Sequence, residues 1–484
     1  MGDKYMGRYR HFIGGDWVSP VSGRWFETYD PSTGQVLASL PGGTAGDIDA
    51  AVSAARQAFS PWAAMDAVDR GRILARIGQK ILRNVERLAK LESLDTGKPL
   101  AQADADVRVA ARYFEFYAGA ADKFGGTTIP VPGAFLDYTL REPLGVVGVI
   151  IPWNYPLQIG ARAIAAPLAV GNTVVLKPAE EASLSIFELA RLCQEEGVPP
   201  GVVNVVAGMG ETAGMPLASH SGIHHLTFTG SLEVGRKVAQ SAASNVVPVT
   251  LELGGKSPHV VFATADLDRA IPIILKSFLQ NAGQTCSAGS RILVQQGLQA
   301  EVVGRLSDAL STVSVGPGIA NPDLGPVISA RQKARVEGYV ALARERGAVI
   351  MEGISPHDER GYYLPPMILD GVRPENPVFH EEIFGPVASV TAFSSEAEAL
   401  SLANATEYGL VAAVWTEDVG QAHRMARQIR SGQVFINSYG AGGGVEMPFG
   451  GYGHSGYGRE KGMEALYHYT QVKNVAVYLG AKVG

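Results

Sequence analysis

Residues 145–177, GVVGVIIPWNYPLQIGARAIAAPLAVGNTVVLK, decide the fold class of this chain. The stretch reads as a short apolar strand (GVVGVII, 145–151), a loop, an apolar helix and a second strand (NTVVLK, 172–177). Two strands joined by a helix are typical of a parallel βαβ unit, whose sheet is covered on both faces. The pattern therefore predicts an α/β fold.

Strands and helices keep alternating toward the C-terminus. The first sheet is expected to gain strands at 202–206, 224–230 and 247–253, with a helix at 183–197. A second group of strands is expected near 291–296, 387–393, 410–415 and 433–437. Two α/β domains are therefore predicted, which a chain of 484 residues can accommodate at about 150 residues per domain.

Three other regions complete the expected organisation. Residues 44–120 carry apolar positions at helical spacing, and residues 123–142 alternate like two short strands. The tail at 467–479 is also strand-like, and a lone strand has to pair with something. It is expected to join the 123–142 hairpin, in the same subunit or in a neighbour.

The composition narrows the functional class. With 46% hydrophobic and 18% charged residues and a net charge of -6, the chain is expected to be globular and not to bind nucleic acid. Cys193 and Cys286 are its two cysteines, which excludes a disulfide framework and fits a reducing cytoplasm. No apolar run of about 18 residues and no signal-like N-terminal segment occur, so no membrane is expected. The histidines form no ligand cluster, so no metal is expected either.

The segment NAGQTCSAGSR, residues 281–291, holds the strongest chemical signal. A lone cysteine is usually a small buried hydrophobe, as expected for Cys193, which lies at helical spacing from Ile186 and Leu189. The small and polar neighbours of Cys286 instead suit a tight, solvent-accessible helix start. Backbone N–H groups there lower a thiol pKa and can hold an oxyanion, so Cys286 is the candidate nucleophile.

A second signal is the acid in TLELGGKSPHVVF, residues 250–262. Glu252 stands between two leucines on a predicted strand, where an apolar residue is usual unless the carboxylate has a task or a partner. One interpretation is a strand-end glutamate paired with a lysine. The other is a general base, because desolvation by Leu251 and Leu253 would raise its pKa toward neutrality.

The third signal is PWNYP, residues 152–156, directly after the first strand. Asn154 is expected in a loop at the carboxyl end of a parallel strand, where α/β proteins bind their ligands. Its amide can donate a hydrogen bond to a developing oxyanion. The alternative is that Asn154 only forms a turn.

Two segments could hold a dinucleotide. FTGSLEVG is expected to form strand, turn and helix, so that Gly230, Ser231 and a helix N-terminus meet a pyrophosphate. Lys177 and Glu180 of KPAE close the second strand, near the place where Rossmann-like sheets bind a ribose hydroxyl. GMGETAG (208–214) departs from the dinucleotide fingerprint and is interpreted as a turn, near the adenine end of the cofactor.

These motifs occur in the order seen in one family. PWNYP, KPAE, FTGSLEVG, LELGGKSP, GQTCSAGSR, EEIFGP and PFGGYGHSGYGRE resemble the aldehyde dehydrogenase superfamily from about residue 150 to residue 475. The resemblance implies a Rossmann-like nucleotide-binding domain, an α/β catalytic domain and a β oligomerisation arm that makes a homodimer or homotetramer. The implied boundaries are 1–122 with 143–253, then 254–455, then 123–142 with 456–484.

The resemblance also implies a reaction, the NAD-dependent oxidation of an aldehyde to the carboxylic acid through a thioester. Cys286 would be the nucleophile, Glu252 the general base for hydrolysis and Asn154 the oxyanion donor. NADP would be the weaker cofactor, because Glu180 would repel a 2′-phosphate. The implied cofactor contacts are Trp153 and Ser231 to the pyrophosphate, Lys177 and Glu180 to the adenosine ribose, Glu382 to the nicotinamide ribose and Phe384 beside the nicotinamide.

Two departures from the family bear on the substrate. Relatives often have Trp-Lys where this chain has Arg162-Ala163, which removes a lysine partner for Glu460. Arg162 is interpreted as pairing with an acid such as Glu446, or else as binding the distal carboxylate of a semialdehyde. Residues 440–444 lack the bulky side chains that narrow the tunnel in relatives, which favours medium or bulky aldehydes, aromatic or branched.

Two further functions stay open at this point. One is a coenzyme A-acylating relative, although such enzymes generally lack the glutamate at position 252. The other is a non-catalytic protein that kept the fold. The presence of Cys286, Glu252 and Asn154 together disfavours it.

Overall fold

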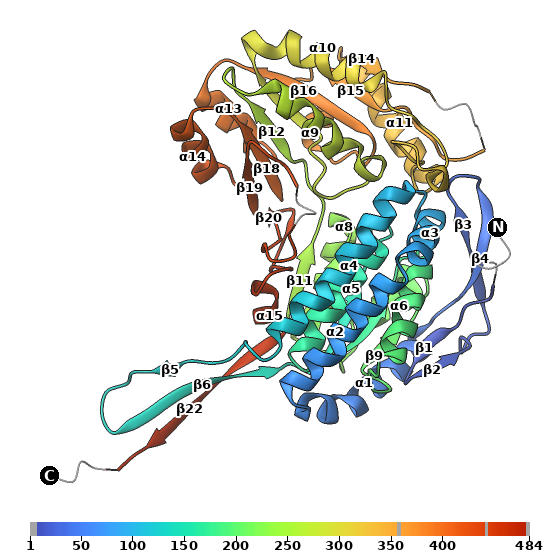
Figure 1. The fold of residues 1–484 in the computed structure, drawn as a ribbon, viewed down its shortest axis with the longest axis vertical. Helices are drawn as coiled ribbons and strands as arrows, with labels where there is room; N and C mark the ends of the chain where they lie inside the picture. The colour runs from blue at the N-terminus through green and yellow to red at the C-terminus, as the bar shows by residue number, and fades with distance from the viewer. Residues whose placement is uncertain (1–6, 356–359, 441–443, 481–484) are drawn as a thin grey trace.

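The computed structural model describes residues 7–355, 360–440 and 444–480. A helix-covered body, a second α/β unit and a projecting β arm make up the molecule (Figure 1). Each of the two larger parts is built around its own sheet and its own apolar core. The two α/β units predicted from the strand–helix alternation are therefore confirmed.

The first part is centred on an eight-stranded sheet in the order β2-β1-β9-β8-β7-β10-β11-β21. The strands from β7 to β11 pair in parallel, as the βαβ pattern predicts, whereas β1, β2 and β21 pair antiparallel. The strands are β1 (His11–Ile13), β2 (Asp16–Val18), β7 (Val146–Ile150), β8 (Thr173–Lys177), β9 (Val203–Val205), β10 (His225–Thr229), β11 (Val249–Glu252) and β21 (Gly456–Tyr457).

Helices cover both faces of this sheet. Val146 and Ile150 of β7 pack into a core with α1, α7 and α8, whereas Val147 and Val149 point to the opposite core, formed chiefly by α2 to α6. Side chains on both faces are thus withdrawn from water, which explains why the strands read as continuous apolar runs. The helices are α1 (Ala45–Ala64), α2 (Ala67–Arg83), α3 (Val85–Thr96), α4 (Leu100–Ala120), α5 (Pro156–Ala169), α6 (Leu184–Glu195), α7 (Met215–Ala218) and α8 (Leu232–Ala243).

The second part holds a seven-stranded sheet in the order β14-β15-β16-β13-β12-β18-β19. Its pairs are parallel except for β14 with β15. The strands are β12 (Pro258–Val261), β13 (Arg291–Gln295), β14 (Val349–Glu352), β15 (Met367–Asp370), β16 (Val387–Phe393), β18 (Val411–Trp415) and β19 (Gln433–Ile436). The helices are α9 (Leu267–Leu279), α10 (Gln299–Leu310), α11 (Ala330–Glu345), α12 (Pro377–His380), α13 (Glu396–Ala403) and α14 (Val419–Gln428).

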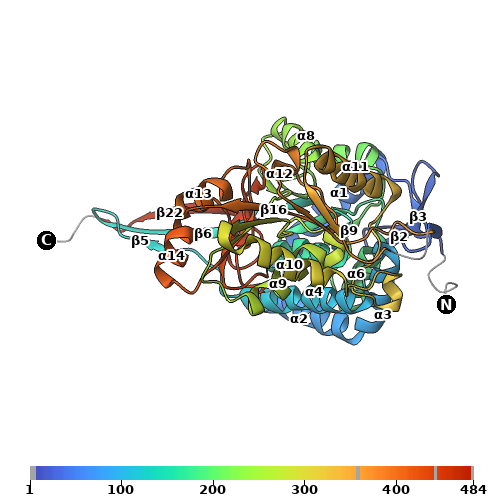
Figure 2. The ribbon, with the colours of Figure 1, turned by 90° about the horizontal axis from the view of Figure 1, so that it is seen from above.

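The arm is a three-stranded sheet that extends away from the body in both views (Figures 1 and 2). Its strands are β5 (Thr128–Ile129), β6 (Phe135–Pro143) and β22 (Thr470–Tyr478). β22 pairs antiparallel with β6 from Thr470 opposite Pro143 to Tyr478 opposite Phe135. The C-terminal strand therefore joins the 123–142 hairpin within the same subunit.

Several short elements were missed or placed differently by the sequence pattern. The hairpin β3 (Trp25–Asp30) and β4 (Gln35–Pro41) was not expected, and GMGETAG forms a π-helical segment, Gly210–Gly214, that leads into α7 instead of a simple turn. The stretch 456–469 was grouped with the arm, but it contains β21, which pairs with β11, and α15 (Glu464–His468). Two-residue strands such as β17 (Tyr408–Gly409) and β20 (Tyr452–Gly453) are too short to show an alternation.

Candidate active site

Cys286 lies in a turn between α9 and β13. The expectation of a helix start is wrong, because α9 ends at Leu279 and a left-handed loop follows instead of a helix. Asn281 and Ala282 both have positive φ values, 53° and 54°, and Gly283 continues the turn at 72°. Non-glycine residues rarely adopt this conformation, so the loop before Cys286 is strained and has to be held in place.

The environment of the Cys286 thiol also differs from the expectation of a lowered pKa. Burial, followed by the Glu252 charge, raises the pKa of Cys286 to about 12, and Arg162 opposes both. The side chain packs against Leu410 and Phe449. The free protein therefore holds a protonated thiol, and an added positive charge or a nearby base is needed to form the thiolate.

Cys193 behaves as the sequence predicts. It is fully buried in α6 within the main apolar core, and burial alone raises its pKa to about 12. Its two neighbours on the helix face, Ile186 and Leu189, are in the same core. The prediction of a packing role for Cys193 is confirmed.

Glu252 ends β11 and is buried, with 2% of its surface exposed. Neither carboxylate oxygen has a hydrogen-bond partner among the described residues. Burial, followed by the charge of Glu460, raises the pKa of Glu252 well above its ordinary value, and Arg162 opposes the shift. The predicted rise in the pKa of Glu252 is confirmed. Leu251 and Leu253 do not cause it, because they pack into the core on the α8 face of the sheet, opposite to Glu252. The residues around Cys286, on the Glu252 face, therefore exclude water from the carboxylate.

Two glycines after β11 allow close approaches at the site. A Cβ atom at Gly255 would meet the Cys286 carbonyl oxygen at 2.6 Å, and one at Gly254 would meet the Glu382 carboxylate at 2.3 Å. A larger residue at position 255 would push the strand end and the Cys286 loop apart. Gly255 thus lets the segment that follows Glu252 lie against the Cys286 loop, and Gly254 leaves room for Glu382.

Asn154 is tied to the same loop, although it comes from the other sheet. Its Nδ2 donates to the Gln284 carbonyl at 2.9 Å, and its own carbonyl accepts from Asn281 Nδ2 at 2.8 Å. The side chain is buried, and its Oδ1 has no partner among the described residues. An amide nitrogen has two hydrogens, so Asn154 keeps one donor beyond its bond to Gln284.

Arg162 is the residue whose partner the sequence did not identify. The structure confirms a salt bridge, but the partner is Glu460 and not Glu446, which pairs with Arg112 at 2.5 Å. Both members of the Arg162–Glu460 pair are buried, and the Thr227 hydroxyl donates to Glu460 Oε1 at 2.6 Å. Glu446 lies on the surface, so it could not supply a buried counter-charge.

The predicted pyrophosphate segment has the expected strand–turn–helix form. Ser231 is the N-cap of α8, and its hydroxyl accepts from the Val234 N–H at 3.4 Å. A Cβ atom at Gly230 would meet the Phe228 ring at 2.5 Å, so only glycine fits the turn. Free N–H groups at a helix start favour an anion, which agrees with a phosphate site.

The remaining candidate cofactor residues lie in two groups. Lys177 Nζ contacts Glu180 Oε2 at 2.9 Å; although burial opposes ionisation, this ammonium holds the pKa of Glu180 below its ordinary value. The rings of Trp153 and Phe384 meet edge to face, 5.5 Å between centroids. Glu382 accepts from the Gly255 N–H at 3.1 Å, and burial raises its pKa to about 7.

No three His, Cys, Asp or Glu side chains of the described residues are grouped as metal ligands would be. No helix within residues 7–355, 360–440 and 444–480 combines the length and apolar character that a bilayer crossing requires.

The fold thus gathers Cys286, Glu252 and Asn154 around one loop and adds the Arg162–Glu460 pair beside them. The parallel strands β7, β10 and β11 are neighbours, so their carboxyl ends meet at one edge. Sequence reasoning missed Thr227, which lies on the same face of the sheet as Thr229, the residue paired in register with Glu252. Two threonines at alternate positions of an apolar strand were the available signal.

Comparison with known proteins identifies the family of the chain. The model of the aldehyde dehydrogenase family matches residues 17–475. The chain is 42% identical over 472 residues to the hydroxyisobutyraldehyde dehydrogenase of Mycolicibacterium austroafricanum, covering 97% of this chain and 93% of that one. It is 43% identical over 477 residues to the mitochondrial aldehyde dehydrogenase of Equus caballus, covering 97% and 95%. The NAD+ complex of an aldehyde dehydrogenase from Bacillus cereus superposes with a TM-score of 0.96 at 41% identity, covering 98% of this chain and 97% of that chain.

Proposed function

The chain belongs to the aldehyde dehydrogenase family, and on that premise we propose that it oxidises an aldehyde through a thioester on Cys286. It is an NAD-dependent aldehyde dehydrogenase. The observation that carries the proposed route is Glu252, a buried carboxylate without a partner among the described residues, whose charge acts on the Cys286 thiol. A buried unpaired carboxylate is costly, so it is kept for a task.

In the first half of the reaction the Cys286 thiolate attacks the aldehyde carbon. A C–S bond forms, and the carbonyl electrons move to oxygen, where the free N–H of Asn154 and a backbone N–H stabilise the oxyanion. When bound, NAD supplies the acceptor for the hydride and a positive nicotinamide ring that favours the thiolate. The site residues hold the oxyanion as it collapses to the thioester carbonyl.

In the second half Glu252 takes a proton from water. The hydroxide equivalent attacks the thioester carbon, the C–S bond breaks, and the carboxylic acid leaves with Cys286 as thiolate. A carboxylate whose pKa is raised is a stronger base than an exposed one. Arg162, which opposes that rise, keeps Glu252 ionised at a lower pH than burial alone would allow.

The residues present fit a dinucleotide. The capped start of α8 at Ser231 suits the pyrophosphate, and the partly buried Glu382 carboxylate beside Gly255 suits a ribose hydroxyl. We assign nucleotide binding to residues 1–122 and 143–253 and catalysis to residues 254–455. Trp153, Lys177, Glu180 and Phe384 complete the proposed cofactor contacts.

NAD is expected to be preferred over NADP. The Glu180 carboxylate, ionised beside Lys177, would accept a bond from the 2′-hydroxyl and repel a 2′-phosphate. Glu180→Ala should raise kcat/KM for NADP relative to NAD by about tenfold, the equivalent of ~1.4 kcal/mol of repulsion. The neighbouring change Glu181→Ala should leave the ratio unaltered. A wild-type ratio that favours NADP would refute the assignment.

We further propose that the substrate is a medium or bulky aldehyde, aromatic or branched. A Cβ atom at Gly440 would meet no atom within 4 Å, whereas residues 441–443 of the same glycine-rich stretch lie outside the described residues. The similar enzyme of Mycolicibacterium austroafricanum is named for a branched aldehyde. Hexanal and benzaldehyde should exceed acetaldehyde in kcat/KM by about tenfold or more, at ~0.8 kcal/mol per buried methylene. A preference for acetaldehyde would contradict the proposal.

The alternative substrate is a semialdehyde with a distal carboxylate. Its support was Arg162, but the guanidinium is already paired with Glu460 in a buried site. A second carboxylate would have to displace Glu460, which would then be buried without a partner. Succinic semialdehyde should therefore not surpass hexanal in the same assay. A strong preference that Arg162→Ala removes would reverse this conclusion.

The β arm is proposed to make a homodimer or homotetramer. It exposes Phe135 and Leu136 on β6 and Val472, Val477 and Tyr478 on β22, although it projects away from the body. Apolar side chains gathered on one projection mark an interface. Light scattering should give at least twice the chain mass of 51.1 kDa, and a chain ending at Tyr469 should shift toward monomer. A stable, active full-length monomer would rule out the assembly.

A further inference from the structure

A fully buried charge cluster lies behind the Cys286 loop, outside the catalytic groups described above. Lys98 Nζ contacts Asp106 Oδ2 at 2.8 Å and Glu92 Oε1 at 3.4 Å. Lys98 and Glu92 are at most 1% exposed and Asp106 is 5% exposed. Two carboxylates around one ammonium are costly to bury, so the cluster calls for a purpose beyond packing.

The cluster is connected to the loop through an aromatic ring. The Lys98 ammonium lies 4.4 Å from the centre of the Tyr155 ring, and the Tyr155 hydroxyl lies 2.8 Å from the hydroxyl of Thr285. Burial raises the pKa of Tyr155 well above its ordinary value, so its hydroxyl keeps its proton. Thr285 directly precedes Cys286. The cation over the ring therefore fixes a phenol that holds the neighbour of the nucleophile.

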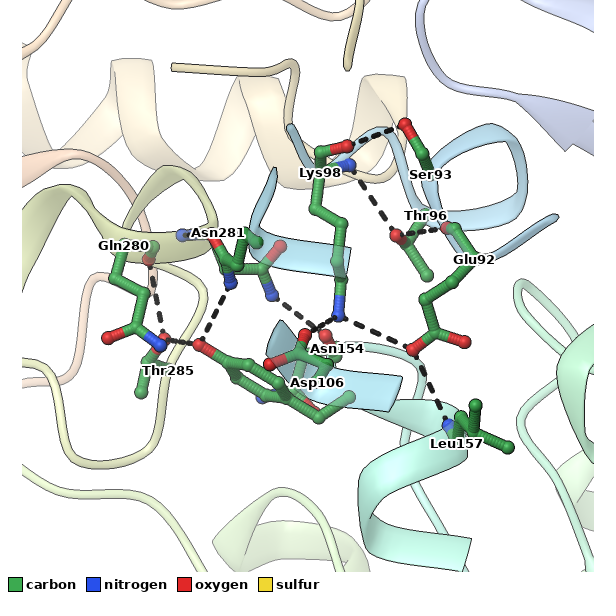
Figure 3. A network of polar contacts seen from close by, with 12 residues as sticks. Glu92, Ser93, Thr96, Lys98, Asp106, Asn154, Leu157, Gln280, Asn281 and Thr285 are labelled. Carbon is green, nitrogen blue, oxygen red and sulfur yellow. Dashed lines mark hydrogen bonds and ion pairs between the residues drawn. The ribbon is translucent and has the colours of Figure 1, made fainter. Parts of the chain in front are cut away.

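A second connection runs from the same helices to the same loop. Gln102 of α4 accepts from the Asn281 N–H at 2.9 Å, and its amide approaches the Tyr155 hydroxyl at 3.4 Å. Glu92 also accepts from the Leu157 N–H at 3.4 Å, near the start of α5. Figure 3 shows Lys98 between Glu92 and Asp106, with Leu157 on one side and Thr285 and Asn281 on the other.

These contacts hold the Cys286 loop in its strained backbone conformation. Asn281 and Ala282 hold positive φ values that a free loop would leave, and the anchors on Asn281 and Thr285 lie on either side of Gly283. Asn154, which follows the same strand as Tyr155, is bonded to the loop as well. One buried cluster therefore underlies both the proposed nucleophile and the proposed oxyanion donor.

We infer that Lys98, Tyr155 and Thr285 form a chain of positioning residues that holds Cys286 in its reactive geometry. The inference rests on the proposed role of Cys286. Lys98 acts through the Tyr155 ring and not on the substrate. Glu92 and Asp106 are its counter-charges. Tyr155 in turn acts on Cys286 through Thr285.

The test measures the rate constant for alkylation of Cys286 by iodoacetamide, located by peptide mass spectrometry, together with kcat. Tyr155→Phe and Thr285→Val each remove the same hydrogen bond and should each lower both values about fivefold. Each variant also loses one longer contact, Tyr155 with the Gln102 amide or Thr285 with the Gln280 carbonyl, both at 3.4 Å. The double variant should nevertheless be little slower than the slower single variant, because the main loss in both is the bond that the two hydroxyls share. The NAD dissociation constant should stay unchanged. Wild-type rates in both single variants, or additive losses in the double variant, would overturn the inference.

The controls separate positioning from stability and from the proposed function. Tyr363→Phe removes another buried hydroxyl bond, 3.0 Å to the Ser32 carbonyl, and should leave the alkylation rate unchanged. Lys98→Arg keeps the cation and should retain the rate, whereas Lys98→Met should lower it by up to about fivefold in the fraction that folds by circular dichroism, because Lys98 acts through the Tyr155 ring. Equal alkylation rates in Lys98→Arg and Lys98→Met would show that Lys98 is not one of the positioning residues. Turnover by Cys286→Ala would instead defeat the proposed function itself.

Discussion

Cys286→Ala should abolish aldehyde oxidation, with kcat falling by at least about 10⁴-fold. Without the sulfur no thiohemiacetal forms. The oxyanion that Asn154 would stabilise is then absent, and so is the species that would donate the hydride. The remaining groups, Glu252 among them, act on a thioester that is never made. The measurement is NADH absorbance with hexanal, in both the steady state and the first turnover, and no NADH should appear in either.

Cys193→Ala is the matched control, because it makes the same chemical change at the other cysteine. Cys193 is fully buried in the apolar core, so its loss should lower the melting temperature by a few degrees and leave kcat near the wild-type value. A Cys286→Ala enzyme that still formed one equivalent of NADH would exclude Cys286 as the nucleophile.

Glu252→Gln should slow turnover by about 10²- to 10⁴-fold and leave a burst of one equivalent of NADH. The charge of Glu252 raises the pKa of the Cys286 thiol, so a neutral glutamine makes the thiolate easier to form and spares the first half of the reaction. Hydrolysis then lacks its base, and the enzyme stalls as the thioester. Rapid-mixing absorbance and the mass of the trapped acyl-enzyme would measure both effects.

The pH dependence of kcat in the wild-type enzyme should also report the ionisation of Glu252. Glu252 acts as a base only when ionised, and burial raises its pKa, so kcat should rise with pH through a limb above the ordinary glutamate range. The limb should vanish in Glu252→Gln and persist in Glu337→Gln, a change at an exposed glutamate of α11. Near-normal turnover in Glu252→Gln would remove this residue from the mechanism.

The sequence alone was sufficient for the fold class and for most of the regular elements. Helices from 44 to 120 and the strands that begin with β7 follow from periodicity, because burial on one or both faces leaves a local pattern in the chain. Short glycine-rich elements such as β20 and β21 were missed, because two residues cannot show a period. The turn expected at GMGETAG is a π-helical segment, Gly210–Gly214.

The candidate residues themselves were also readable from the sequence, because the types and neighbours of Cys286, Glu252 and Asn154 are local features. Their electrostatic states were readable only in part, because the raised pKa of Glu252 was expected and that of Cys286 was not. The thiol was expected to have a lowered pKa, and in the structure burial and Glu252 raise it. A pKa depends on desolvation and on charges from distant segments, which only the packed fold brings together.

Partner choice is the clearest property that the tertiary structure decided. From the sequence, Glu446 was named as an example of an acid that could pair with Arg162, whereas the fold places Glu460 in the buried site and Glu446 at the surface beside Arg112. Tyr155 and Thr285 are 130 residues apart, yet their hydroxyls meet at 2.8 Å. The sequence therefore determined which side chains can perform the chemistry, since that is a property of each residue. The fold decided which of them act together, because ion pairs and hydrogen bonds act only over a few ångströms.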